Sequence, residues 1–180
     1  MINLYRYVTF ISFILIFTSC SDDSTGPSGD DLGEASFEIS GAIEGQKEGF
    51  ANFRAFEMSG VNTWDILLID EPPRSFEISF SQVSLNESIS RPSTGTYKLG
   101  LDSDSDFSAS YSEGSLARPD SYLTTFGEYS GTLVITSSSD DKIEGTFEFN
   151  AVNLDEENGE EIIIRNGQFR AVPRQGGINQ

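Results

Sequence analysis

The chain contains no histidine and one cysteine among its 180 residues. Without histidine it cannot build a Ser-His-Asp or Cys-His nucleophilic site or a histidine-ligated zinc site. With Cys20 alone it cannot form a disulfide within the chain, so its folded part depends on packing and hydrogen bonding. The sequence also has no P-loop and no dinucleotide fingerprint. We therefore expect no cofactor and no metal site.

Basic residues are scarce, with 11 lysines and arginines against 29 aspartates and glutamates and a net charge of −18 at pH 7. A charge of this sign repels nucleic acid and anionic membrane faces. We therefore expect no nucleic-acid partner, and either neutral or cationic partners or none. An enzyme on this chain would have to rely on carboxylates, as a two-carboxylate glycoside hydrolase does. Among so many acids some pair always looks suitable, so we expect the protein not to be an enzyme.

The N-terminus has the layout of an export signal. Met1–Tyr7 carries one charged side chain, which is basic, and Val8–Phe17 is apolar apart from one threonine and one serine. Thr18 and Ser19 are small and stand directly before Cys20. This order is typical of a signal that is cleaved after export. The apolar segment has about half of the roughly 20 residues that a membrane-spanning helix needs.

The segment Ile16–Cys20 resembles the cleavage box of bacterial lipoprotein signals, in which a small residue precedes an acylated cysteine. The resemblance implies that residues 1–19 are removed and that Cys20 becomes a lipidated N-terminus with a membrane partner through its lipid anchor. Several acyl chains on one residue make a durable tether. We expect an outer-membrane protein that faces the periplasm or the cell surface. A secretory signal with an incidental cysteine and a short N-terminal membrane anchor are the alternatives.

Residues 20–33 comprise Cys20 and a segment rich in Ser, Asp and Gly. Such a segment buries too little apolar surface to offset the entropy of ordering it, so we expect a flexible acidic linker. Ser21 after the cysteine resembles sorting to the outer membrane. Asp22 and Asp23 resemble the acidic export tag of surface-displayed lipoproteins in Bacteroidota-type bacteria, although solubility alone explains an acidic pair equally well.

After position 33, apolar and polar residues alternate along most of the chain. Ile143, Phe147 and Phe149, for example, alternate with Glu144 and Glu148. This period of two predicts strands with one buried and one exposed face, as antiparallel sheets allow. No window of helical length has a convincing apolar stripe. The predicted strands cover residues 35–43, 49–57, 64–69, 74–81, 95–101, 107–111, 131–136, 143–151 and 161–172.

Turn signals rich in Gly, Pro, Asn and Asp separate these strands. Asn166-Gly167 predicts either a two-residue hairpin or a bulge inside one long final strand. Nine or ten short strands in one domain predict an all-β fold, a single antiparallel β-sandwich or barrel-like domain. We assign this domain to residues 34–174 and a short C-terminal tail to residues 175–180.

Four strand-and-turn phrases follow one another in the C-terminal half: Gly95–Tyr97, Ser130–Ile135, Ile143–Phe149 and Ile163–Phe169. Their order resembles a widespread group of Bacteroidota-type lipoprotein domains of unknown function. The resemblance covers Gly95–Val172 and implies an all-β anchored domain. It supplies no activity for this chain.

Asp102, Asp104 and Asp106 are spaced like the first ligands of a calcium loop, and Glu113 stands at the twelfth position of that loop. The sixth position holds Phe107 instead of the glycine that the sharp turn requires, and the flanking segments are predicted strands. The three aspartates share one face of an extended strand, which suits a hard cation. A solvated polar edge explains them equally well.

Aromatic residues offer another candidate site, since Trp64, Tyr111, Tyr122, Phe126 and Tyr129 could form a platform on which sugars stack. Aromatic side chains in a β-sandwich usually fill the core instead. The alternation places Tyr111 and Tyr129 with the inward side chains. Tyr122 and Phe126 are the candidates for exposure.

Three functional hypotheses follow. We prefer a membrane-anchored envelope lipoprotein that acts as a non-enzymatic structural or interaction module, with an envelope protein as its partner. The second is an accessory lipoprotein that binds a glycan or another ligand. The third is a carboxylate-dependent glycoside hydrolase, which would need a deep cleft with two facing acids.

Overall fold

The computed structural model describes residues 32–70, 76–85, 87–115, 118–125, 128–154 and 159–174. These residues form an all-β domain. Its ten strands are β1 (Glu34–Gly41), β2 (Gly45–Met58), β3 (Val61–Ile69), β4 (Phe76–Leu85), β5 (Gly95–Leu99), β6 (Ser108–Ser115), β7 (Arg118–Leu123), β8 (Gly131–Ser138), β9 (Ile143–Asn153) and β10 (Glu161–Pro173). Over the same ranges, no helix has the length and apolar character needed to cross a membrane.

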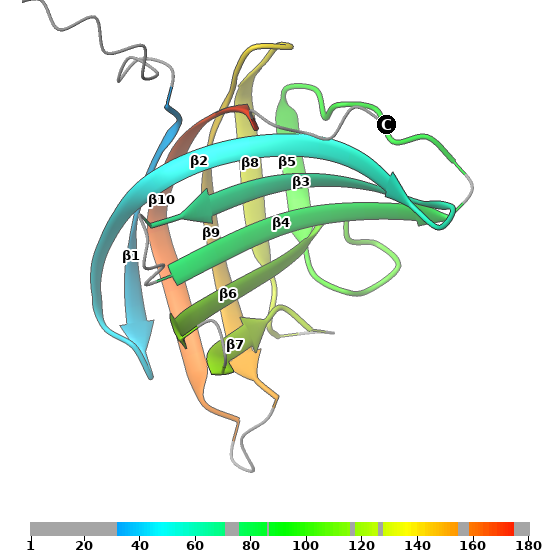
Figure 1. Ribbon diagram of the computed structural model, residues 1–180. Coiled ribbons are helices and arrows are strands. Elements are labelled where there is room, and N and C mark those ends of the chain that lie inside the picture. Colours follow the sequence, from blue (N-terminus) through cyan, green and yellow to red (C-terminus); the bar gives the residue numbers. More distant parts are fainter. Residues whose placement is uncertain are drawn as a thin grey trace, which may run out of the picture.

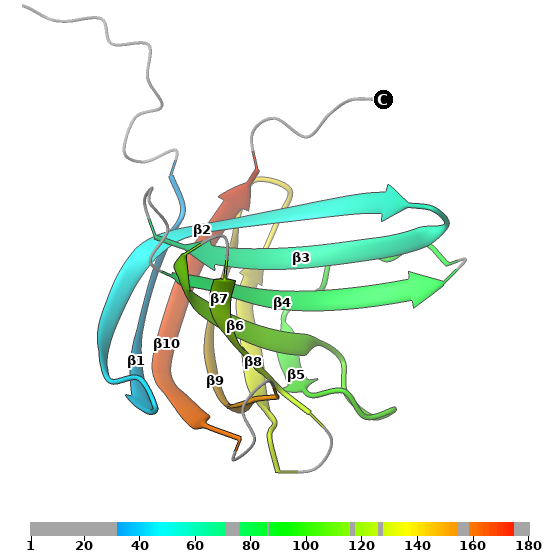
Figure 2. The ribbon, with the colours of Figure 1, turned by 60° about the horizontal axis from the view of Figure 1, so that its bottom comes forward.

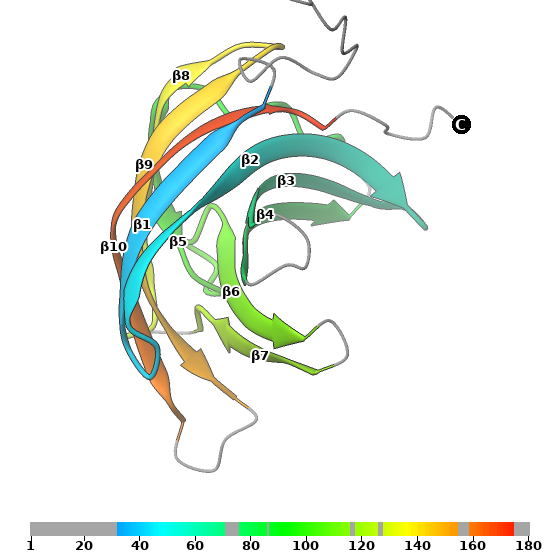
Figure 3. The ribbon, with the colours of Figure 1, turned by 60° about the vertical axis from the view of Figure 1, so that its left-hand side comes forward.

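Eight strands close into an antiparallel barrel in the order β1, β2, β3, β4, β6, β7, β9 and β10, and β10 pairs back onto β1. The other two strands branch from β9. The first part of β9 pairs with β8, which carries β5 as its outer neighbour, and Val152 and Asn153 of β9 pair with β7. Figure 3 shows β8, β9, β10 and β1 side by side in one curved wall, with β6 and β7 across the interior. The prediction of an antiparallel barrel-like domain is confirmed.

The alternation that predicted the strands also sets which side chains enter the barrel. In β9, Ile143, Phe147 and Phe149 are at most 3% exposed and Gly145 is buried with them, while Glu144, Thr146 and Glu148 face outward. In β10 a bulge shifts the register between Ile164 and Gly167, and a single strand continues through it. The bulge interpretation of this sequence is therefore correct and the hairpin interpretation is wrong.

Aromatic rings fill the barrel interior. The Phe147 ring lies 5.1 Å from that of Phe80 and 6.1 Å from that of Phe37, which in turn meets Phe76 edge to face at 5.1 Å. Tyr111 packs against the same group and is fully buried. Contacts at these separations are typical of aromatic clusters in protein cores. The interior is therefore a packed core.

The structure corrects two details of the predicted elements. Residues 118–123, which the predicted strands do not include, form β7, because they pair with β6 from Arg118 to Leu123. Leu101, predicted as an inward residue of a strand, lies beyond the end of β5 and is 46% exposed. The strand β5 ends at Leu99, two residues before the predicted end at Leu101.

Three strands run past the barrel on one side, as Figures 1 and 2 both show for β2, β3 and β4. The pairing of β4 with β6 ends at Ser81, and the pairing of β2 with β10 ends at Phe53. Beyond these points the three strands pair only with one another, up to Met58, Val61 and Leu85. We call residues 54–58, 61–65 and 82–85 the β2–β4 extension.

Candidate functional site

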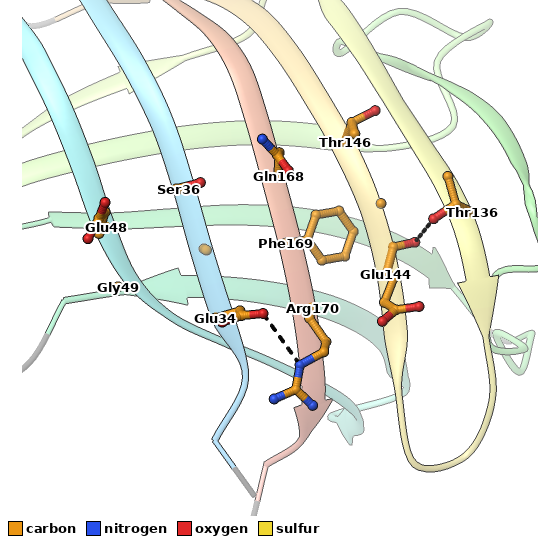
Figure 4. Close-up of a pocket in the computed structure, with 12 residues that line it drawn as sticks. Glu34, Ser36, Glu48, Gly49, Thr136, Glu144, Thr146, Gln168, Phe169 and Arg170 are labelled. Carbon is orange, nitrogen blue, oxygen red and sulfur yellow. Dashed lines mark hydrogen bonds and ion pairs between the residues drawn. The ribbon is translucent and has the colours of Figure 1, made fainter. Parts of the chain in front are cut away.

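A polar groove crosses the outer surface of the wall formed by β2, β1, β10, β9 and β8, and Figure 4 shows the side chains around it. Its volume is about 630 Å³. The groove is open along its length and runs across the strands. Its lining is polar, with the side chains of Glu34, Ser36, Glu48, Thr136, Glu144, Thr146, Gln168 and Arg170.

One wall of the groove is a row of side chains from four neighbouring strands. The register places Ser36 beside both Glu48 and Gln168, and Gln168 beside Thr146. Strands lie about 4.8 Å apart, so this row extends over about 14 Å. Sequence analysis did not find the row, because its members are far apart in the chain and each looks like an ordinary polar residue on an exposed strand face.

The opposite wall centres on Arg170. Its Nε lies 3.7 Å from Oε1 of Glu34, and its Nη2 donates to the carbonyl oxygen of Leu32 at 3.0 Å. On the next strand, Oε1 of Glu144 lies 2.9 Å from Nζ of Lys142. The groove therefore presents one guanidinium among carboxylates, hydroxyls and an amide. Such a set can exchange hydrogen bonds with a polyhydroxylated or amine-bearing ligand.

A second groove of about 540 Å³ lies on the other side of the same row. Asn166 of β10 donates from Nδ2 to Oε2 of Glu38 at 3.0 Å there, and Glu148 and Thr132 stand on the neighbouring strands. We call the outer surface of β1, β8, β9 and β10, together with the first part of β2, the acidic face. Its outward charged residues include Glu34, Glu38, Glu48, Glu144, Glu148, Arg165 and Arg170.

The predicted calcium-loop residues hold a turn together. Oδ1 of Asp102 accepts hydrogen bonds from the backbone N–H of Asp104 at 3.2 Å and from Oγ of Ser105 at 2.6 Å. Nζ of Lys98 lies 2.9 Å from Oδ2 of Asp102, and Oδ2 of Asp106 accepts from the backbone N–H of Lys98 at 2.7 Å. The bonds from Ser105 and Lys98 lower the pKa of Asp102. The loop thereby covers the open edge of β5, which protects an edge strand from unwanted pairing.

The other positions of the proposed calcium loop also have structural partners. Phe107 is 2% exposed and packs edge to face on Tyr97, with ring centroids 5.4 Å apart. Glu113 lies near the far end of β6, about 20 Å along the strand from the turn. Within the residues that the structure describes, no three acidic side chains gather in a way that could hold a metal ion.

A partly buried polar cluster lies at the end of the barrel where β2 begins. Nζ of Lys47 lies 2.7 Å from Oε1 of Glu113, and the Tyr111 hydroxyl donates to the other carboxylate oxygen of Glu113. Burial, with the contact to Glu113, raises the pKa of Tyr111 far above its ordinary value of 10.0. The cluster joins β2 to β6 across the interior, and its groups satisfy one another.

The aromatic residues proposed as a sugar platform do not gather on the surface. Trp64 and Tyr111 belong to the core, as the core-packing interpretation predicted. Tyr122, expected to be exposed, is 2% exposed because it faces inward from β7. Tyr129, expected inside, is half-buried, and its hydroxyl donates to Oε1 of Glu161 at 2.5 Å. Phe126 lies outside the described residues.

The outer surface of the β2–β4 extension carries an apolar patch. Exposed fractions are 37% for Phe56, 69% for Met58, 58% for Val83 and 70% for Leu85. The register places Val61 between Met58 and Leu85, so all five side chains lie on the same face. Sequence analysis missed this patch because the predicted strands ended at positions 57 and 81. The i, i+2 spacing of Phe56 with Met58 and of Val83 with Leu85 was the available signal.

Next to the patch lies a nearly uncharged part of the same surface. Arg54 stacks over the Phe56 ring at 4.5 Å and pairs with Asp65, with Nη2 and Oδ2 3.1 Å apart. Ser81 donates to the other oxygen of Asp65 at 2.7 Å. We call this surface, from the patch to the Arg54–Asp65 pair, the neutral face. It contrasts with the acidic face on the other side of the barrel.

Fold and surfaces together define a class of protein: a closed antiparallel β-barrel with a packed interior, whose candidate binding surfaces lie on its outside. Residues 75–173 match the model of a family described as a domain of unknown function (DUF6252). The match covers more than half of the chain, so the chain belongs to this family. No curated protein and no solved structure matches the chain significantly.

The matched segment contains β4 to β10, and β1 to β3 precede it. The barrel nevertheless closes through β1 and β2, which lie between β10 and β3. Residues 1–31, with Cys20, the predicted signal and most of the predicted linker, and the predicted tail 175–180 lie outside the described residues, so their assignment rests on the sequence. The last two residues of the predicted linker are described, and the carbonyl oxygen of Leu32 accepts the hydrogen bond from Arg170.

Proposed function

We propose that the protein is an envelope lipoprotein, anchored to the outer membrane through Cys20, that acts as a non-enzymatic interaction module. The observation that carries the interaction role is the contrast between a barrel interior filled by aromatic side chains and an outer surface that carries open grooves, the polar groove among them. Ligand or partner binding on such a domain takes place on the outside. The signal, the lone cysteine and the acidic linker support the anchor.

Metabolic labelling with a palmitate analogue tests the anchor in cells that express the full chain. The wild-type protein incorporates the label and sediments with outer membranes. Cys20→Ala gives an unlabelled, unprocessed or soluble product. Ser21→Ala is the matched control, because it changes a neighbouring small residue and leaves the thiol in place. Labelling of Cys20→Ala at the wild-type level would refute the proposed lipid anchor at Cys20.

A glycan ligand in the groove is a second candidate function, and the lining of the groove favours it. Gln168, Thr146, Ser36 and Arg170 offer donors and acceptors along a path wide enough for several sugar units. Affinity electrophoresis in gels that contain neutral polysaccharides tests the idea. Binding that Gln168→Ala weakens, and that Thr132→Ala in the second groove leaves unchanged, would support a glycan in the first groove. Unretarded migration in every polysaccharide would argue against it.

A carboxylate-dependent hydrolase is the third possibility, but the groove acids Glu48 and Glu144 stand three strands apart, about 14 Å, whereas the two acids of a glycosidase lie roughly 5–9.5 Å apart. Each lies on the wall of an open groove. Release of reducing ends from a panel of polysaccharides is the direct assay. Activity that Glu48→Gln abolishes would replace the non-enzymatic proposal.

A further inference from the structure

We infer that the apolar patch on the β2–β4 extension is the contact surface for a second copy of this chain. Of the eight large hydrophobic residues that are exposed in the described part of the chain, four belong to this patch: Phe56, Met58, Val83 and Leu85. Scattered exposed hydrophobic residues are ordinary, whereas several on one contiguous surface mark an interaction site. The inference does not depend on the lipid anchor or on either groove.

The placement of these side chains indicates that the partner surface is a β-sheet. They lie on one face of three paired strands. The register aligns them in two rows across the strands, Phe56–Thr63–Val83 and Met58–Val61–Leu85. The turn at the tip of the extension is Ser59-Gly60, which is small and polar. A hairpin that inserts into a lipid surface would carry apolar side chains at its turn. An apolar sheet face instead matches another sheet, because packed sheets interdigitate side chains at about 10 Å separation.

Charge favours the neutral face over the acidic rest of the surface as the place where two copies meet. The chain has a net charge of −18, so two copies repel each other over most orientations. On the neutral face, Arg54 and Asp65 pair with each other at 3.1 Å, and the patch beyond them has no acidic side chain on its side of the sheet. Two copies that meet through this face bring the fewest like charges together.

The size of the surface fits an interface of modest area. Three strands about 4.8 Å apart, with about five residues each at about 3.4 Å, give a footprint of roughly 15 by 17 Å. The adjoining serine positions of β4 and β6 extend it across the neutral face, where Ser79 and Ser81 pair with Ser110 and Ser108. The footprint of the patch is roughly 250 Å², about a third of the roughly 800 Å² that each partner buries in a standard interface, so the patch supplies the apolar centre and the serines supply part of the polar rim.

An isologous dimer follows from these properties. When the same patch is used on both copies, residues near its centre meet their own counterparts across a two-fold axis. Thr63 is central, since the register places it between Phe56 and Val83. Such a dimer also covers the exposed side chains of Met58 and Leu85.

Cysteine cross-linking in cells that express the full chain tests the inference. Cys20 is the only natural cysteine, so an introduced thiol reports with little background. After mild oxidation, Thr63→Cys gives a dominant band at twice the monomer mass on a non-reducing gel, and Val83→Cys gives the same band if the axis lies nearer β4. Thr132→Cys is the matched control, because it is also a half-buried outward threonine of a central strand, on the acidic face.

A second set of variants separates specific pairing from random collision. Met58→Glu added to Thr63→Cys places like charges in the proposed interface and reduces the dimer band to the level of Thr132→Cys. Thr146→Glu adds the same charge on the acidic face and leaves the band unchanged. Monomer from both Thr63→Cys and Val83→Cys, equal cross-linking of Thr132→Cys, or a band of another mass would overturn the inference.

Discussion

Replacing Phe147 with alanine tests whether the barrel interior is a packed core. Phe147 is 3% exposed and stands at the centre of the aromatic cluster. Its ring centroid lies within 6.5 Å of those of Phe37, Phe80, Phe149 and Phe169. Removing the ring therefore leaves a cavity that four neighbouring aromatic side chains can fill only in part.

Truncation of a buried phenylalanine to alanine costs about 3–5 kcal/mol, from lost burial and from the cavity. Total stabilities of domains are about 5–15 kcal/mol, so we expect the variant to lose roughly a fifth or more of its free energy of unfolding. The corresponding fall in Tm is about 10 °C or more for a domain of this size.

Phe56→Ala is the matched control, since Phe56 also lies on a strand but is 37% exposed on the outer face. We expect it to cost about 1–2 kcal/mol in a dilute, monomeric sample, less than half of the loss for Phe147→Ala, because a large part of its ring is already exposed. Urea denaturation followed by the fluorescence of Trp64, the only tryptophan and 3% exposed, gives both values. Equal losses for the two variants, or a loss below about 1 kcal/mol for Phe147→Ala, would refute the packed interior.

Three further predictions concern polar groups. Arg54→Ala removes two hydrogen bonds from the buried carboxylate of Asp65, so unfolding free energy measured in urea should fall by about 2 kcal/mol, and an unchanged value would contradict the pairing. The bond to Glu161 raises the pKa of Tyr129 to about 12 from 10.0. Because the folded state then keeps a proton that the unfolded chain loses, stability falls as pH rises from about 10 to about 12. Tyr129→Phe should flatten that fall in urea titrations at each pH, and an identical fall would count against the bond. Calcium should produce no binding heat in calorimetry, since the carboxylates of Asp102–Asp106 serve the turn, and a saturable heat would revive the calcium loop.

The sequence predicted the strands best where one face is fully buried. In β9 strict alternation of apolar and polar residues predicted both the strand and its inward set. It failed at β7, where Pro119 and Asp120 look like turn residues although the segment pairs with β6. Tyr122 was misplaced for the same reason, because a segment taken as irregular gives no inward or outward face.

Closure of the barrel could not be derived from local patterns. It depends on β10 meeting β1, as in the pairing of Ala35 with Phe169, between segments at opposite ends of the domain. The candidate surfaces depend on the same long-range register. Ser36 and Gln168 become neighbours in the groove only when that pairing is formed. The sequence shows which residues are acidic or aromatic. It does not show which side chains of different strands become neighbours, and these neighbours form the surfaces.

The extension illustrates the remaining limit of sequence reasoning. Phe56 and Met58 look like inward residues of an ordinary strand, because alternation gives two faces without saying which one is covered. Their exposure follows from the register, which places them on the outer face of β2 with Arg54, opposite the buried Ala51 and Phe53.

Mass spectrometry of the protein purified from its native membrane tests the central claim most directly, because the proposed role depends on where the chain is anchored. The account predicts an N-terminal peptide that begins at Cys20 and carries acyl groups. A peptide that still begins at Met1, with an unmodified thiol at Cys20, would contradict it.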